Sequence, residues 1–231
     1  MDMTNTLKYM FLFGLGLSYI PNQTVYAQDT SIYQMEKLDR GLVALPAQNQ
    51  GIFLSWRLLG TDSKHVCFDV ERDGKIIAHQ VKLTNYTDPK GSSANSYRII
   101  SYQSEPKMDA PAEREVSKAV KPWMDLYRSL PIKRPAGGVT PDGKSYEYTP
   151  NDCSVGDVDG DGEYEIILEW DPTNAHDNSH DGYTGEVIFD CYKLDGTQLW
   201  RINLGKNIRA GAHYTQFLFY DLDGDGKEEI S

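Results

Sequence analysis

The sequence lacks an excess of basic residues. Its 231 residues include 23 Lys and Arg against 34 Asp and Glu, which gives a formal net charge of −11 at pH 7. Because nucleic-acid phosphates attract a basic protein surface, this balance argues against binding to nucleic acid. An acidic surface is compatible with cation binding or with solubility alone. We therefore expect no nucleic-acid partner.

Cysteine is also scarce. The sequence contains Cys67, Cys153 and Cys191, and their spacing fits no zinc-ligand pattern. An odd number of cysteines leaves at least one unpaired. We expect them to be small, buried apolar side chains, and one disulfide of unassigned pairing stays open as the alternative.

The apolar run Tyr9–Ile20 is too short for a membrane span, which takes about 20 residues. It follows Lys8 and precedes a polar stretch that ends in small residues before Gln28. This order is typical of a secretory signal peptide, with a buried strand as the alternative. No cysteine stands at the cleavage point, so we expect no lipid anchor. We predict a signal peptide over residues 1–27 and a secreted or periplasmic mature protein.

Turn and strand signals are abundant, with 20 Gly, 11 Pro and 15 Tyr. In residues 28–138 we predict strands over 51–59, over 68–78 around an Asp73-Gly74 hairpin and over 96–102, with a turn at 84–89. Residues 109–127 have helical spacing that Pro122 interrupts, which favours an acidic loop followed by an edge strand. The pattern predicts a small β-sandwich of the immunoglobulin or fibronectin type.

A turn-rich linker over residues 135–143 precedes a change in character. From Tyr146 the sequence alternates acidic, glycine-rich loops with short strands, which we predict at 166–170, 186–192, 198–202 and 217–220. Asp195-Gly196 predicts a hairpin between the second and third of these strands. We therefore assign residues 139–231 to a second β-domain.

Two segments of this second domain repeat the pattern D-x-D-G-D-G-x-x-E, from Asp157 and from Asp221, 64 residues apart. Acids at positions 1, 3 and 5 converge, glycines at 4 and 6 permit positive φ, and position 7 offers its backbone carbonyl. The acid at position 9, followed by a strand, distinguishes these loops from EF-hands. We predict calcium at both loops, with acidic surface turns as the alternative. The candidate metal residues are Asp157, Asp159, Asp161, Glu163, Glu165, Asp221, Asp223, Asp225, Lys227 and Glu229.

Strand-flanked calcium loops of this kind occur on β-propeller blades. One blade of four strands takes roughly 40–50 residues, or more with long loops. The spacing of 64 residues therefore predicts two successive blades. A closed propeller needs about four to eight blades, so we expect this sequence to be a truncated piece of a longer protein.

Several motifs resemble the rhamnogalacturonan lyases of polysaccharide lyase family 11. They lie at residues 41–45, 51–60, 151–165, 169–174 and 207–217, and the resemblance covers residues 34–230. It implies an all-β protein in which a small β-domain precedes an eight-bladed propeller with several bound calcium ions. It also implies β-elimination at the rhamnose–galacturonic acid linkage of rhamnogalacturonan I, a pectin polysaccharide.

The resemblance further implies that Asn151 and Asp171 contact the saccharide in a cleft. Arg209 could pair with a uronate carboxylate, and His213 stands in the same stretch, with structural hydrogen bonding as the alternative for both. β-Elimination needs a cation against the uronate and a base for the C5 proton. The family's catalytic base is expected in later blades, so we assign no catalytic residue and expect this piece alone to be inactive.

Other functions stay open. A non-catalytic, calcium-stabilised carbohydrate-binding module of the adhesion type would share the loops, and sequence beyond Ser231 would discriminate. The carboxylates would also permit a glycosidase pair, which only the resemblance disfavours. An open propeller made alone would expose strand edges that invite aggregation. We expect a monomer whose partner is the pectin polysaccharide and which has no membrane span.

Overall fold

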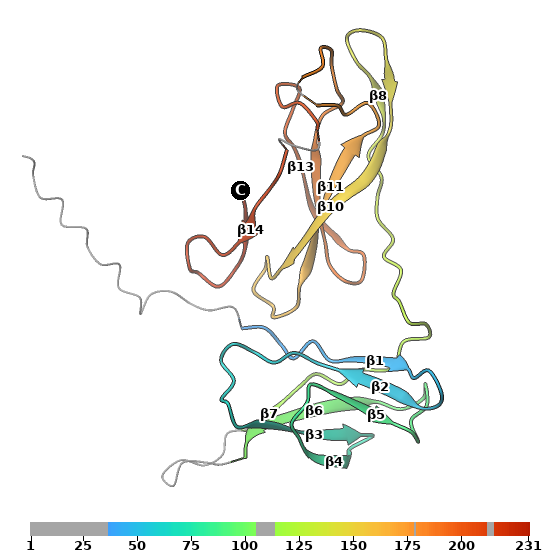
Figure 1. The fold of residues 1–231 in the computed structure, drawn as a ribbon, viewed down its shortest axis with the longest axis vertical. Coiled ribbons are helices and arrows are strands. Elements are labelled where there is room, and N and C mark those ends of the chain that lie inside the picture. Colours follow the sequence, from blue (N-terminus) through green and yellow to red (C-terminus); the bar gives the residue numbers. More distant parts are fainter. Residues whose placement is uncertain (1–36, 105–113, 178, 212–214) are drawn as a thin grey trace, which may run out of the picture. The chain divides into compact units, whose positions relative to one another are not determined.

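The computed structural model describes residues 37–104, 114–177, 179–211 and 215–231. These residues belong to one compact unit, Ile32–Ser231. Their regular elements are β-strands in antiparallel sheets (Figure 1). Within these ranges no helix is long and apolar enough to cross a membrane. The predicted signal peptide, residues 1–27, lies outside the described residues.

The strands in chain order are β1 (Val43–Pro46), β2 (Ile52–Ser55), β3 (Val66–Arg72), β4 (Lys75–Val81), β5 (Asn85–Asp88), β6 (Tyr97–Gln103), β7 (Arg114–Val116), β8 (Gly138–Val139), β9 (Ser145–Tyr146), β10 (Tyr148–Gly156), β11 (Glu165–Pro172), β12 (Ile188–Tyr192), β13 (Gln198–Asn203), β14 (Phe219–Tyr220) and β15 (Glu229–Ile230). They form sheets in the orders β1–β2–β5, β4–β3–β6–β7, β8–β9, β10–β11–β12–β13 and β14–β15.

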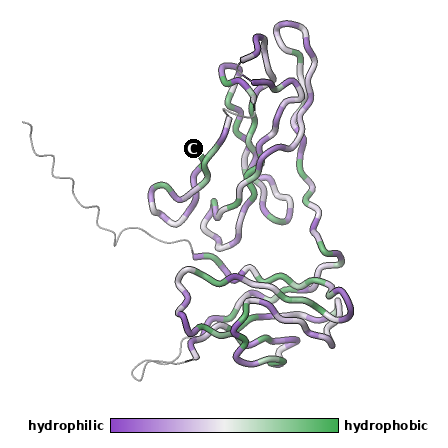
Figure 2. The backbone as a smooth tube through the Cα atoms, in the orientation of Figure 1, coloured by the Kyte–Doolittle hydropathy of each residue, from purple (hydrophilic) through white to green (hydrophobic). Residues whose placement is uncertain are grey.

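The first two of these sheets share one hydrophobic core. The Trp56 ring, directly after β2, packs edge-on against Phe68 of β3 with ring centroids 5.3 Å apart. Along β6, Tyr97 and Ile99 are buried while Arg98 between them is exposed. This alternation, visible as changing colour along the strands in Figure 2, is typical of a sheet with one face in the core. The strands predicted over 68–78 and 96–102 and the Asp73-Gly74 hairpin are confirmed, whereas the strand predicted over 51–59 is shorter, because β2 ends at Ser55.

The predicted turn at 84–89 is wrong, because β5 occupies most of it. Its residues pair with β2, with Tyr86 opposite Leu54. Asp88, at the end of β5, is buried and accepts hydrogen bonds from Arg72 and the Tyr97 hydroxyl at 2.7 and 2.9 Å. These tertiary contacts outweigh the turn preference of Asn, Thr and Asp.

The predicted edge strand within residues 109–127 is present as β7, which pairs with β6 at the end of the second sheet. Val120 continues the contact as an isolated bridge to Tyr97. No helical turn forms in the described part of this stretch, residues 114–127. This agrees with the expectation that Pro122 interrupts a helix here.

The four strands β10–β13 form a meander in which each strand pairs with the next (Figure 1). β11, β12, β13 and the Asp195-Gly196 hairpin are confirmed, whereas β14 is shorter than predicted. β10 was not predicted. It carries Pro150, and its register with β11 shifts between Pro150 and Cys153. An outer strand tolerates such a proline and bulge because its other edge forms no ladder.

Both faces of the β10–β13 sheet are covered. One face carries a core that includes Leu168 and Trp170, and the other carries a core that includes Ile167 and Phe189. All five residues of β12 are buried. The cysteines are free thiols. The expectation of buried side chains is confirmed for Cys67 and Cys191 and wrong for Cys153, which is exposed on the outer strand β10.

A buried carboxylate lies at the centre of this sheet. Asp190 of β12 is fully buried and accepts two 2.7 Å hydrogen bonds from Arg201, through Nε and Nη2. Trp170, Tyr192 and Gln198 donate three further hydrogen bonds to it at 2.7–3.0 Å. Burial would raise the pKa of Asp190, but the hydrogen bonds from Arg201, Tyr192 and Trp170 outweigh it and hold the pKa below its usual range.

We predict that Asp190→Asn lowers the free energy of unfolding by about 3 kcal/mol at neutral pH, because it breaks a buried ion pair. The effect should fade as the pH falls below the ordinary Asp pKa of about 3.9 towards its lower value in the folded state. Urea denaturation at several pH values measures the loss of stability and its pH dependence. Asp195→Asn, an exposed change in the same hairpin, is the control and should change stability by less than about 1 kcal/mol. Equal effects of the two substitutions would contradict the prediction.

Candidate functional site

The first acidic loop, residues 157–165, connects β10 to β11. The buried carboxylate of Asp157 organises it by accepting three backbone hydrogen bonds of 2.7–3.1 Å, from Gly160, Asp161 and Gly162. Glu165 closes the loop by accepting a 3.0 Å hydrogen bond from the Val158 amide. These hydrogen bonds from backbone donors fix the loop's path.

The second acidic loop, residues 221–229, repeats this arrangement position by position. The Asp221 carboxylate accepts hydrogen bonds of 2.7–3.1 Å from the backbone N–H groups of Gly224, Asp225 and Gly226. Glu229 accepts one of 2.9 Å from the Leu222 amide. Two segments 64 residues apart in the sequence therefore adopt the same local structure.

Glycines permit this winding. Gly160 and Gly162 have φ values of 78° and 88°, and Gly224 and Gly226 have 77° and 90°. Other residues adopt such angles at an energetic cost because of their Cβ atoms. The four positive φ values confirm the prediction that the sequence pattern made for positions 4 and 6.

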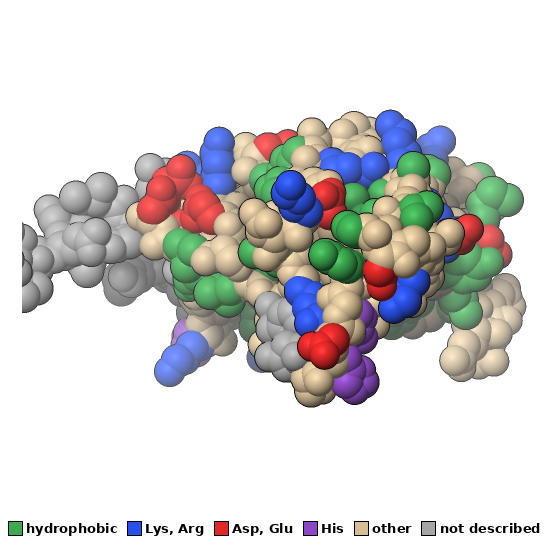
Figure 3. Space-filling view, turned by 90° about the horizontal axis from the view of Figure 1, so that it is seen from above, with side chains coloured by type: hydrophobic (Ala, Val, Ile, Leu, Met, Phe, Trp, Pro, Cys, Tyr) green, Lys and Arg blue, Asp and Glu red, His purple; other side chains and the backbone are tan. Residues whose placement is uncertain are grey.

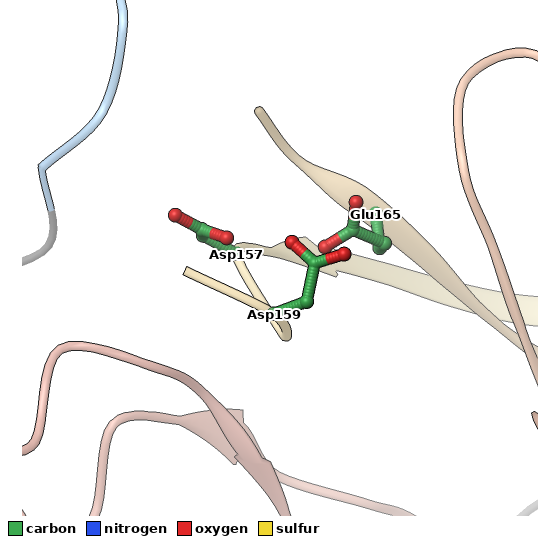
Figure 4. A group of neighbouring side chains, drawn as sticks. All are labelled: Asp157, Asp159 and Glu165. Carbon is green, nitrogen blue, oxygen red and sulfur yellow. The ribbon is translucent and has the colours of Figure 1, made fainter. Parts of the chain in front are cut away.

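In each loop, carboxylates converge in a way that suits a metal ion. Oxygen atoms of Asp157, Asp159 and Glu165 lie within 4.8 Å of one another, as do those of the group Asp221, Asp223 and Asp225. In Figure 4 the Asp159 and Glu165 carboxylates face one another beside Asp157. A donor set made only of oxygens fits a hard cation such as Ca²⁺.

The remaining predicted metal residues differ in their surroundings. Asp161 accepts a hydrogen bond from the Glu163 amide, and the Asp225 carboxylate accepts the equivalent bond from Lys227. The exposed side chain of Glu163 pairs with Lys118 at 2.8 Å, so its carboxylate is engaged away from the converging group. Any ligand from position 7 would therefore be the backbone carbonyl, as the sequence pattern suggested.

Beside Lys118, a second ammonium group reaches the first acidic loop from outside it. Lys193 Nζ lies 2.8 Å from the Asp161 carboxylate, and its hydrogen bond is the main reason why the pKa of Asp161 falls below its usual range. Glu165, by contrast, has a raised pKa because it is buried. The loop is therefore a site of concentrated negative charge that Lys118 and Lys193 partly neutralise.

The predicted saccharide residues Asn151 and Asp171 lie at the other end of the β10–β11 hairpin. Asn151 donates a 3.1 Å hydrogen bond to Glu169, a buried carboxylate whose pKa burial raises. Asp171 is half-buried, and burial together with neighbouring Asp152 raises its pKa. Its side chain accepts no hydrogen bond from the described residues, so it is available to a ligand.

Arg209 lies among the residues of the loop over 174–182. Its guanidinium contacts the His176 ring and donates to the His180 carbonyl. The two histidine rings stack with centroids 6.2 Å apart. Figure 3 shows histidine, acidic and basic side chains together on one face of the molecule. His213, the other predicted residue of this region, lies outside the described residues.

Two features of the sites carried no clear sequence signal. Glu169 lies within a strand, and nothing in its neighbours indicates that it would be buried beside Asn151. Lys193 is 28 positions after Glu165, and only the hairpin of β12 and β13 brings it to the loop. Strand pairing, once known, would have indicated both positions.

Comparison with known proteins covers most of the chain. Residues 33–123 match the model for the "Rhamnogalacturonan I lyases beta-sheet domain", and residues 127–231 match that for "Rhamnogalacturonan lyase family 11, C-terminal domain". The chain is 52% identical over 230 residues to rhamnogalacturonan endolyase YesW of Bacillus subtilis (strain 168), covering 99% of this chain and 35% of the relative. It is 54% identical over 200 residues to rhamnogalacturonan exolyase YesX of the same organism, covering 86% of this chain and 32% of that relative.

Solved structures agree with these similarities. The crystal structure of YesW superposes with a TM-score of 0.77 at 56% identity, over 86% of this chain and 33% of that one. The rhamnogalacturonan lyase PL11 of Bacillus licheniformis also gives a TM-score of 0.77, at 55% identity, over 86% and 33%. The chain thus spans about a third of the length of the relatives that it matches.

We predict that Asp157→Asn disrupts the first acidic loop while leaving the second intact. The amide group cannot accept all three backbone hydrogen bonds, and each lost bond costs about 1 kcal/mol. Hydrogen–deuterium exchange should therefore quicken at Gly160 and Gly162. Asp221→Asn is the matched variant and should quicken exchange at Gly224 and Gly226 instead. Unchanged exchange in the substituted loop would show that its carboxylate does not hold it.

Proposed function

Because the chain belongs to the rhamnogalacturonan lyases of polysaccharide lyase family 11, we propose that its protein cleaves the rhamnose–galacturonic acid linkage of rhamnogalacturonan I by β-elimination. The observation that carries this proposal is the 52% identity to an endolyase over 230 residues. An exolyase matches at 54%, so this segment does not distinguish endo from exo action. The chain represents about a third of either relative, and the catalytic base is proposed to lie in the rest of the protein.

We propose that the acidic loops hold calcium. Their residues fit the ion: each loop gathers three carboxylates within 4.8 Å, and backbone amides already fix the path of each loop. The holding residues are Asp157, Asp159, Glu165, Asp221, Asp223 and Asp225, with Asp161 and Glu229 beside them. When bound, calcium supplies the positive charge that these carboxylates lack.

The position of the first acidic loop favours a stabilising role for its cation. Asp157 and Asn151 are six residues apart on one strand and its turn, on the order of 20 Å at about 3.3 Å per residue. A cation in that loop therefore does not contact a sugar held at Asn151 and Asp171. It fixes the end of the β10–β11 hairpin that presents these residues. Neutralisation of the uronate requires a different positive group.

Asn151 and Asp171 are proposed to contact the saccharide directly. The Asn151 amide is positioned by its hydrogen bond to Glu169, which leaves its carbonyl oxygen free to accept a sugar hydroxyl. The Asp171 carboxylate has no hydrogen-bond partner among the described residues, so a sugar hydroxyl can donate to it. Arg209 is already held by His176 and His180, and its role is proposed to be positioning of that loop.

The architecture and location are part of the same proposal. The four-stranded meander β10–β13 has the form of one propeller blade, and β14–β15 would begin the next. The paired sheets before it would form the small β-sandwich. Residues 1–27 are proposed to direct export, as expected for an enzyme whose substrate is a polysaccharide. The competing candidate is a calcium-stabilised carbohydrate-binding module without catalysis.

We predict that calcium stabilises the chain. At a free concentration of 100 times the Kd, each occupied loop should add about 2.7 kcal/mol to the free energy of unfolding, and a chelator should remove it. Thermal unfolding with calcium, with magnesium and with chelator measures the effect. Asp223→Asn should remove the part of this stabilisation that the second loop contributes. Identical melting curves in calcium and chelator would contradict a calcium role.

A chimera tests the lyase proposal. Replacing the matched segment of the YesW endolyase with this chain should leave an enzyme that releases unsaturated uronate, measured by near-ultraviolet absorbance. In that chimera, Asp171→Asn should lower kcat/KM about tenfold or more, the effect of losing one hydrogen bond to a charged group. Asp195→Asn is the control. A folded chimera that binds rhamnogalacturonan I without cleaving it would favour the binding module.

A further inference from the structure

Lys193 occupies the side of the first acidic loop on which its carboxylates converge. Its Nζ lies 2.6 Å from Asp159, 2.8 Å from Asp161 and 3.7 Å from Glu165. These are the acids at positions 3, 5 and 9 of the loop. The lysine side chain is only 28% exposed, so the protein confines it there. An ammonium thus neutralises oxygens that a metal ion would also use.

The backbone delivers Lys193 to this place. It directly follows β12 and begins the turn to β13, where its amide donates to Thr197 at 2.8 Å and its carbonyl accepts from Gly196 at 2.9 Å. Since β12 pairs with β11 and Tyr192 lies opposite Ile166, the turn lies beside the loop that begins β11. The position of Lys193 therefore follows from the strand register.

The second acidic loop has no equivalent lysine among the described residues. Its six matching backbone hydrogen bonds are present, but no ion pair joins a Lys or Arg of the described ranges to Asp221, Asp223 or Asp225. The two loops thus share one backbone structure and one pattern of acids.

We propose that Lys193 is an internal counter-ion of the first acidic loop, so that this loop binds calcium more weakly than it would without the lysine. This inference rests on the proposed calcium role of both loops. An entering ion must displace the ammonium from Asp159 and Asp161 or share these carboxylates with it, and either costs free energy. Without calcium, Lys193 relieves the repulsion among the acids. The first loop thereby keeps its structure when calcium is scarce.

Calorimetric titration of the full chain with calcium chloride tests this proposal. Asp159→Asn should remove the site of the first loop and Asp223→Asn that of the second. These substitutions stand at position 3 of their respective loops. Lys193→Met should tighten the site that Asp159→Asn removes about tenfold, which corresponds to about 1.4 kcal/mol. Lys193→Arg, which keeps the charge, should retain the weaker binding.

Controls separate this role from a general effect of charge or a loss of folding. Lys144→Met removes a lysine that pairs with Asp142 at 3.0 Å, outside both loops, and should leave the calcium affinity of each loop unchanged. Circular dichroism establishes that each variant is folded. Melting adds a second readout: Lys193→Met should lower the Tm in chelator and show a larger rise with calcium than the unsubstituted chain.

The outcomes distinguish this inference from the calcium proposal beneath it. Calcium binding with an unchanged affinity in Lys193→Met would overturn the counter-ion role and leave the calcium proposal standing. Tightening of the site that Asp223→Asn removes would overturn the assignment to the first loop. Absence of calcium binding in every variant would overturn both proposals.

Discussion

The fold buries some carboxylates and brings others close together, so each needs a positive group or hydrogen-bond donors beside it. The rest of the structure depends on these partners. A buried charge without a partner is strongly unfavourable, and this chain carries a net charge of −11. Asp190 is balanced by Arg201 and three neutral donors inside one sheet. Asp157 and Asp221 are balanced by backbone amides at the end of a hairpin. Each arrangement fixes the strands that it joins.

The acidic loops hold more negative charge than their own backbone donors can offset. Their backbone amides satisfy the acid at position 1 but leave several neighbouring carboxylates within 4.8 Å of one another. In the first loop Lys193 supplies part of the missing charge. The proposed calcium supplies the rest and fixes one end of the hairpin whose other end carries Asn151 and Asp171. Cation binding and saccharide recognition are then linked through β10 and β11, without contact between ion and sugar.

Local patterns in the sequence predicted the acidic loops, the positive φ of their glycines and most strands, because each depends on neighbours in the chain. The wrong or missing predictions concern segments whose structure depends on residues distant in the sequence. Residues 84–89 have turn-forming side chains, yet pairing with β2 makes most of them a strand. β10 was missed because Pro150 and a bulge obscure its alternation. Neither the burial of Glu169 nor the approach of Lys193 follows from spacing, since both require the register of the sheet.

Anomalous X-ray diffraction from crystals grown with calcium tests the central claim most directly. One bound ion is expected in each acidic loop, against Asp157 and Asp159 in the first and Asp221 and Asp223 in the second. Anomalous peaks are therefore predicted at both positions, with Lys193 displaced wherever the peak of the first loop appears. Well-ordered loops without peaks at saturating calcium would contradict the account, because their carboxylates would then be balanced by the protein alone.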